Sequence, residues 1–184
     1  MRFTLVFEGD LPPKANSTQK WGIRRALEPQ LRALWQSSQL EGLERFQNPT
    51  YLPSDCYVGR KIGSLEFIPL ISPKLDLRVE LKIILLSASL PGGLVNRSGD
   101  LDNRMKTLLD ALSVPTPQQL VPEGSHESDG RVFCLLDDDR LIIKLDVSND
   151  RLLTEQQESR RALAIITVRP IAFRATMANI GFTA

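Results

Sequence analysis

Alternating apolar and polar positions predict several β-strands along this chain. Residues 2–9 alternate and carry β-branched and aromatic side chains, and residues 64–71 form a second strand-like run. Residues 75–88 alternate most clearly, with apolar side chains at the odd positions from Leu75 to Ile83 and charged side chains at the even positions between them. The remaining predicted strands lie in residues 132–147, on both sides of an acidic turn, and in residues 162–173.

Two other segments show the repeat of about 3.6 residues that is typical of amphipathic helices. In residues 22–46 the apolar positions follow this spacing, but Pro29 is comfortable only in a first turn, so we expect the helix to begin near Glu28 or to break there. We expect both tryptophans, Trp21 and Trp35, to lie in the core. Residues 101–112 predict a second helix. The apolar positions of the second helix are Leu101, Met105, Leu108, Leu109 and Leu112.

These elements predict an α/β (α+β) protein with one small mixed sheet of about four to five strands and helices packed on it. Residues 113–131 are rich in proline, glycine and serine and predict a flexible surface excursion. The tail after Arg174 is weakly patterned and is predicted to fray. No repeat or change of composition divides the chain, so we expect a single domain over residues 1–184.

Composition narrows the functional classes only slightly. The chain has 184 residues, of which 42% are hydrophobic and 24% charged, and a formal net charge of +1. This net charge does not indicate a nucleic-acid or membrane partner, although the protein can still have a local basic patch. Cys56 and Cys134 have no metal-type spacing and are expected to be free thiols. The longest apolar run, residues 83–90, is far too short to span a bilayer, and we expect a cytoplasmic protein without a membrane partner.

The segment GDLDNRMKTLLDAL, residues 99–112, contains the first candidate chemistry. Asp100 and Asp102 stand at the start of the predicted helix, where carboxylates often act as caps. Capping needs only one of them, and a second acid in the same turn suits a shared divalent cation such as Mg²⁺. Lys106 follows Asp102 by one helical turn, either as an ordinary ion-pair partner or as a cation placed for a phosphate.

A second acidic segment, LLDDDRLI in residues 135–142, bears on the same question. Three consecutive aspartates between apolar runs form either a solvated turn or the remaining part of a metal cluster. A third carboxylate from a separate segment would complete an aspartate-based site that binds one or two ions for phosphodiester hydrolysis.

Together these motifs resemble the RusA-type Holliday-junction resolvases, which are small dimeric Mg²⁺-dependent endonucleases of bacteria and prophages. That family pairs a DLDN-x-x-K helix start and a D-A-L helix end with a later L-D-D, and a Pro-Pro turn with a nearby asparagine follows its first strand. The matching residues here are Asp100, Leu101, Asp102, Asn103, Lys106, Asp110, Ala111 and Leu112, then Leu136, Asp137 and Asp138, and Pro12, Pro13 and Asn16.

The resemblance implies a RusA-like fold and assigns roles to individual residues. Asp100, Asp102 and Asp138 would hold Mg²⁺ or Mn²⁺ and Lys106 would act as the catalytic cation, while Asp137 stays open as the third ligand. The family usually has a non-acidic residue where this chain has Asp139. Among the basic residues, those expected to contact DNA are Lys14, Lys20 and Arg97.

The implied function is structure-selective hydrolysis of phosphodiester bonds in branched DNA, during recombination and repair, by a homodimer without a small-molecule cofactor. Two alternatives remain open. One is a catalytically silent nucleic-acid-binding dimer, which the modest net charge favours and the complete set of aspartates disfavours. The other is an interaction or metal-binding domain in which the acids are only caps and turns.

Overall fold

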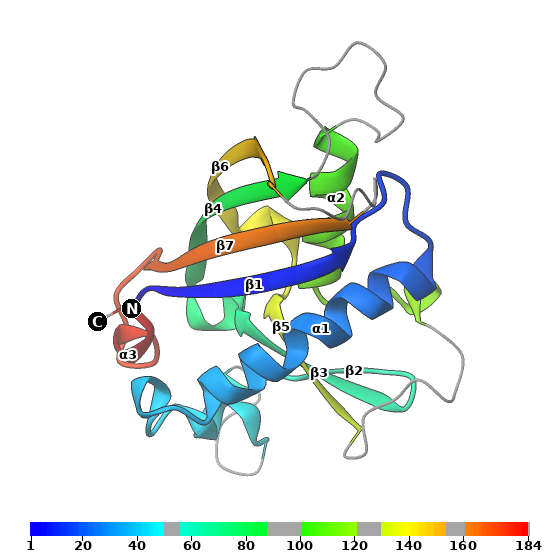
Figure 1. Ribbon diagram of the computed structural model, residues 1–184. Coiled ribbons are helices and arrows are strands. Elements are labelled where there is room, and N and C mark those ends of the chain that lie inside the picture. The colour runs from blue at the N-terminus through cyan, green and yellow to red at the C-terminus, as the bar shows by residue number, and fades with distance from the viewer. Residues whose placement is uncertain (50–55, 88–100, 121–129, 154–160, 184) are drawn as a thin grey trace.

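Two β-sheets and three α-helices make up the computed structural model, which describes residues 1–49, 56–87, 101–120, 130–153 and 161–183 (Figure 1). The predicted α+β class is confirmed. The strands, however, form two sheets where the sequence predicted one, because alternation identifies a strand without identifying the strand it pairs with. The RusA-like character of the fold stays a prediction.

The larger sheet has the strand order β1-β7-β4-β6. Its strands β1 and β4 both pair antiparallel with β7, while β4 and β6 run parallel. The smaller sheet has the order β2-β3-β5, with β2 antiparallel and β5 parallel to β3. The bounds are β1 Phe3–Asp10, β2 Arg60–Ile62, β3 Leu65–Ile71, β4 Leu77–Ser87, β5 Arg131–Leu136, β6 Ile142–Arg151 and β7 Arg161–Ala172.

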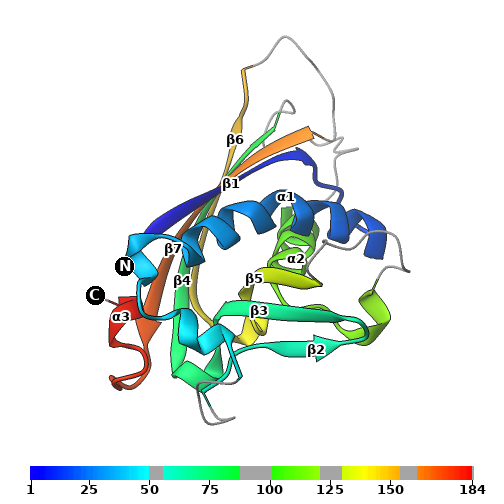
Figure 2. The ribbon, with the colours of Figure 1, turned by 90° about the horizontal axis from the view of Figure 1, so that it is seen from below.

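Three helices accompany the sheets: α1 (Ser17–Trp35), α2 (Leu101–Leu112) and the short α3 (Ile180–Thr183). Helix α1 contacts β1 of the larger sheet, β5 of the smaller sheet and helix α2. Figure 2 shows the larger sheet as a curved wall with α1 and α2 on one side of it. No helix among the described residues is long and apolar enough to cross a membrane.

The chain passes twice from the smaller sheet to the larger one, through two 3-10 turns. Strand β3 leads through η3 (Pro73–Leu75) into β4, and β5 leads through η5 (Asp139–Leu141) into β6. These passages lie side by side, since β3 is parallel to β5, β4 is parallel to β6, and the Asp137 amide donates to the Ile71 carbonyl at 2.9 Å. The acidic triplet therefore lies at a corner between the two sheets.

One hydrophobic core joins residues from both sheets and from α1 and α2. The odd positions of β4 are buried and its even positions are not, as the alternation predicted. Both tryptophans are buried as well, as predicted: Trp35 lies in this core and Trp21 lies in a smaller cluster over β2, β3 and β5. The short strand β2 was not predicted, because its segment is rich in turn residues.

Helix α1 runs without interruption through Pro29, so the predicted start or break at this position is wrong. The helix begins after Asn16, whose side chain accepts from the Gln19 amide at 2.9 Å while the Gln19 side chain accepts from the Asn16 amide at 3.0 Å. Pro29 lies on the exposed side of the helix, where water can solvate the backbone around its ring. The buried side packs into the core and offsets the cost of the proline.

The C-terminal tail folds against the core, contrary to the predicted fraying. The side-chain Nδ2 of Asn179 donates to the carbonyls of Leu75 at 2.8 Å and Arg174 at 2.7 Å. Phe182 is fully buried and packs edge-on against Trp35, with 5.8 Å between the ring centroids. The tail lacks a periodic apolar pattern because a single phenylalanine anchors it.

The predicted excursion at residues 113–131 is described only in part. Ser113 forms a bridge with Leu136, and a 3-10 turn, η4 (Pro117–Gln119), follows. Residues 121–129 lie outside the described part of the chain, so the prediction of flexibility there stays a prediction.

Candidate functional site

The two acidic segments meet at a hollow of about 360 Å³ between α2 and β6. Asp102 and Lys106 reach it from the first turns of α2, and Asp139 reaches it from the 3-10 turn before β6. The full lining is Leu101, Asp102, Met105, Lys106, Leu109, Asp139, Leu145 and Val147. Three charged side chains from segments more than thirty residues apart thus share one surface with an apolar floor.

Helical spacing explains which side of α2 lines the hollow. Leu101, Met105 and Leu109 recur every four residues and form one row, and Asp102 and Lys106 form the adjacent row. The opposite side of the helix is buried in the core. Within the described ranges no ion pair joins Lys106 to Asp102 or to Asp139, so the simple intrahelical pair considered for this lysine is not formed.

A β-bulge brings two apolar side chains of β6 to the same hollow. Val79 of β4 pairs with Ile142, but the next residue of β4, Glu80, pairs with Lys144, so Ile143 is the extra residue. After the bulge Leu145 and Val147 lie on the face of β6 that lines the hollow. The sequence analysis placed these two residues in a predicted strand but did not name them as site residues; the alternation of apolar and polar residues along β6 was the available signal.

The three aspartates of the triplet have different surroundings. Asp137 forms an ion pair with Arg60, with 2.6 Å between Oδ1 and Nη1. Asp138 caps the 3-10 turn, and its Oδ1 accepts from the Arg140 amide at 2.9 Å. Asp139 is the one of the three that lines the hollow. The structure therefore brings Asp139 to Asp102 and Lys106, whereas the resemblance selected Asp138.

Two of the predicted residues, Asp100 and Arg97, lie outside the described residues, and their roles stay predictions. Within the described ranges, no group of three or more His, Cys, Asp or Glu side chains is arranged to hold a metal ion. The donor set is nevertheless suitable for Mg²⁺, because this ion takes oxygen ligands and commonly uses one or two protein carboxylates together with phosphate oxygens and water. Asp102 and Asp139 offer two such carboxylates, both exposed at the hollow.

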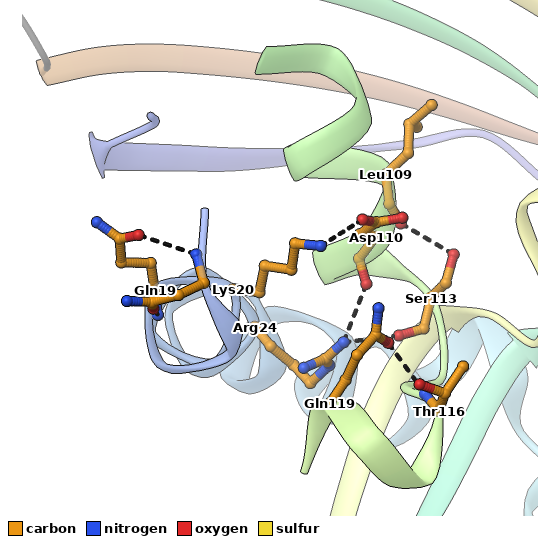
Figure 3. A network of polar contacts seen from close by, with 9 residues as sticks. Gln19, Lys20, Arg24, Leu109, Asp110, Ser113, Thr116 and Gln119 are labelled. Carbon is orange, nitrogen blue, oxygen red and sulfur yellow. Dashed lines mark hydrogen bonds and ion pairs between the residues drawn. The ribbon is translucent and has the colours of Figure 1, made fainter. Parts of the chain in front are cut away.

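Contacts with α1 hold the C-terminal end of α2 (Figure 3). The Lys20 ammonium lies 2.6 Å from a carboxylate oxygen of Asp110, and the Arg24 guanidinium donates to the carbonyls of Asp110 at 3.0 Å and Ser113 at 2.9 Å. Arg24 is buried beside the Trp21 ring, and this burial lowers the pKa of its guanidinium. Positive groups at the C-terminus of a helix also stabilise it, because they interact favourably with the negative end of the helix dipole. We call this set of contacts the α1–α2 clamp.

The clamp changes the interpretation of the basic residues. Lys20, predicted to contact DNA, forms an ion pair with Asp110, and its contact with DNA stays a prediction. Arg104, in the row next to the hollow, is buried, and burial lowers its pKa while the charge of Asp10 opposes that shift. Lys14, in the turn after β1, is exposed, and its contact with DNA likewise stays a prediction.

Searches against protein-family models, curated proteins and solved structures find no match to this chain. The resemblance to the RusA-type resolvases therefore rests on the sequence motifs alone.

Proposed function

We propose that the hollow between α2 and β6 is the active site of a metal-dependent endonuclease acting on branched DNA. The observation that carries this proposal is the shared position of Asp102, Lys106 and Asp139 on one accessible surface. Two carboxylates and one cation in this arrangement suit a phosphodiester, because the carboxylates can hold a divalent cation and the ammonium can hold a non-bridging phosphate oxygen. The resemblance supplies the substrate class and adds Asp100 and Asp138 as further candidate ligands.

Each side chain then has a defined task. The carboxylates of Asp102 and Asp139 would hold Mg²⁺ or Mn²⁺, which when bound supplies Lewis-acid activation of water and neutralises phosphate charge. Lys106 orients the scissile phosphate and stabilises the negative charge that develops on it. The α1–α2 clamp holds the helix on which Asp102 and Lys106 lie, so that their positions relative to Asp139 are maintained.

We further propose that the protein acts in the cytoplasm as a homodimer, since two symmetric sites would allow paired nicks across a four-way junction. The alternative is a nucleic-acid-binding dimer that does not cut, and it is favoured by the finding that no group of three or more His, Cys, Asp or Glu side chains among the described residues is arranged to hold a metal ion.

The test uses a labelled synthetic four-way junction and a linear duplex of the same arm sequences, each with Mg²⁺, Mn²⁺ or a chelator. The proposal predicts nicking of the junction that requires a divalent cation and is lost in Asp102→Asn. Cleavage that survives Asp102→Asn would contradict the proposed site. Junction binding without cleavage at any metal concentration would support the silent-binder alternative.

A further inference from the structure

The floor of the hollow has a property that phosphate chemistry does not require. Five of its eight lining residues are apolar: Leu101, Met105, Leu109, Leu145 and Val147. Leu145 is 41% exposed although it lines the hollow together with residues of α2. Apolar surface left open beside charged groups is typical of a binding site.

The rim of the hollow restricts the chemistry of its occupant. It carries a cation at Lys106 and carboxylates at Asp102 and Asp139, and α2 begins there with the positive end of its helix dipole. A nucleotide matches these features, because its phosphate suits both the Lys106 cation and a metal ion that Asp102 and Asp139 would hold, while the faces of its base suit the apolar floor. An apolar peptide side chain would match the floor but would leave charges of both signs on the rim without partners.

We propose that the hollow receives one unstacked DNA base, whose adjoining phosphate is the one bound by Lys106. This inference rests on the proposed nuclease function and names the part of the substrate that the site recognises. The volume of about 360 Å³ lies at the lower end of the range for small-ligand sites. Bases next to a branch point lose less stacking when they turn outward than bases within a duplex do, so such a site favours branched or single-stranded DNA.

Strand β6 offers a matched pair of substitutions for the test. Leu145 lines the hollow, whereas Ile143, the bulged residue two positions earlier, is 55% exposed and does not line it. Leu145→Ser removes part of the apolar floor, and Ile143→Ser makes a similar change of polarity on the same strand outside the hollow.

The experiment is an NMR titration of the full chain in the presence of a chelator, so that no cleavage occurs. The probes are deoxynucleoside monophosphates and deoxyribose 5-phosphate, which has the same phosphate and sugar but no base. The monophosphates are expected to shift the methyl signals of Leu145 and Met105 and to bind at least about tenfold more tightly than the sugar phosphate. Leu145→Ser should abolish this difference, and Ile143→Ser should preserve it.

Equal affinity for the sugar phosphate and the nucleotides would overturn the inference, as would shifts confined to residues away from the hollow. An apolar helical peptide is titrated as the competing probe, and tighter binding of this peptide than of any nucleotide would also overturn the inference, in favour of a protein partner. The cleavage assay is separate, which distinguishes the two failures. If the protein nicks DNA in a metal-dependent way but binds deoxyribose 5-phosphate as tightly as the nucleotides, only this inference is wrong. If it binds the nucleotides through the hollow but does not nick DNA, the proposed nuclease function is wrong.

Discussion

Replacing Phe182 by alanine tests whether the C-terminal tail is part of the folded core. Phe182 is 0% exposed and contacts the rings of Trp35, at 5.8 Å between centroids, and Phe46, at 6.0 Å. Phe→Ala at a fully buried site costs about 3–5 kcal/mol of unfolding free energy, through lost burial and the cavity left behind. This is a large fraction of the roughly 5–15 kcal/mol by which most domains are stable.

Phe173 provides the matched control, because it is 64% exposed and belongs to the same terminal segment. Its ring lies 5.2 Å from the Arg78 guanidinium, a contact that contributes roughly 0.5–1 kcal/mol at an exposed site. With a urea slope of about 2 kcal/mol per molar, Phe182→Ala should lower the unfolding midpoint by about 2 M and Phe173→Ala by less than about 0.5 M.

The assay is urea unfolding followed by circular dichroism and by tryptophan fluorescence, since Trp35 reports directly on the Phe182 contact. Similar small shifts for the two variants would refute the docking of the tail. A large shift for Phe173→Ala alone would show that the segment packs through the other phenylalanine.

Two further predictions concern the α1–α2 clamp and the thiols. A double-mutant cycle with Lys20→Met and Asp110→Asn should give a coupling of about 1 kcal/mol in unfolding free energy, because these half-buried groups lie 2.6 Å apart; additive effects would show that the pair contributes nothing. Burial raises the pKa of Cys134 to about 11, so this thiol stays protonated and inaccessible near neutral pH. A thiol reagent at about pH 8 should therefore modify only Cys56 in the folded protein and both thiols in denaturant, and rapid modification of both in the folded state would contradict the structure.

Local patterns predicted the elements that carry the site. The bounds of α2 and the buried face of β4 agree with the sequence analysis, because amphipathic periodicity depends only on neighbours in the chain. The division into two sheets could not be read in the same way, since it depends on which distant strands pair. Pro29 shows a further limit, because the packing of a whole helix face outweighed a local preference.

The sequence identified individual residues of the candidate site but did not show which of them lie together in space. Asp102 and Lys106 were named from the motif at the start of the helix, and within the triplet the resemblance selected Asp138, left Asp137 open and gave Asp139 no role. In the 3-10 turn at the corner, Asp138 accepts from the Arg140 amide, whereas Asp139 lines the hollow, and no local pattern indicates this difference. The pairing of Lys20 with Asp110 joins residues 90 positions apart, so no local pattern indicates it.

The central claim is that α2 and the acidic corner form one metal-dependent site, and the most direct test compares two aspartate substitutions. Asp139 lines the hollow, while Asp150 is exposed on the opposite face of β6. In Mg²⁺, Asp139→Asn should slow nicking of the four-way junction by about a hundredfold or more, because substituting even the residues that hydrogen-bond to metal ligands lowers activity by about tenfold to a hundredfold. The Asp150→Asn variant should nick at the wild-type rate. Equal rates for the two variants would contradict the account.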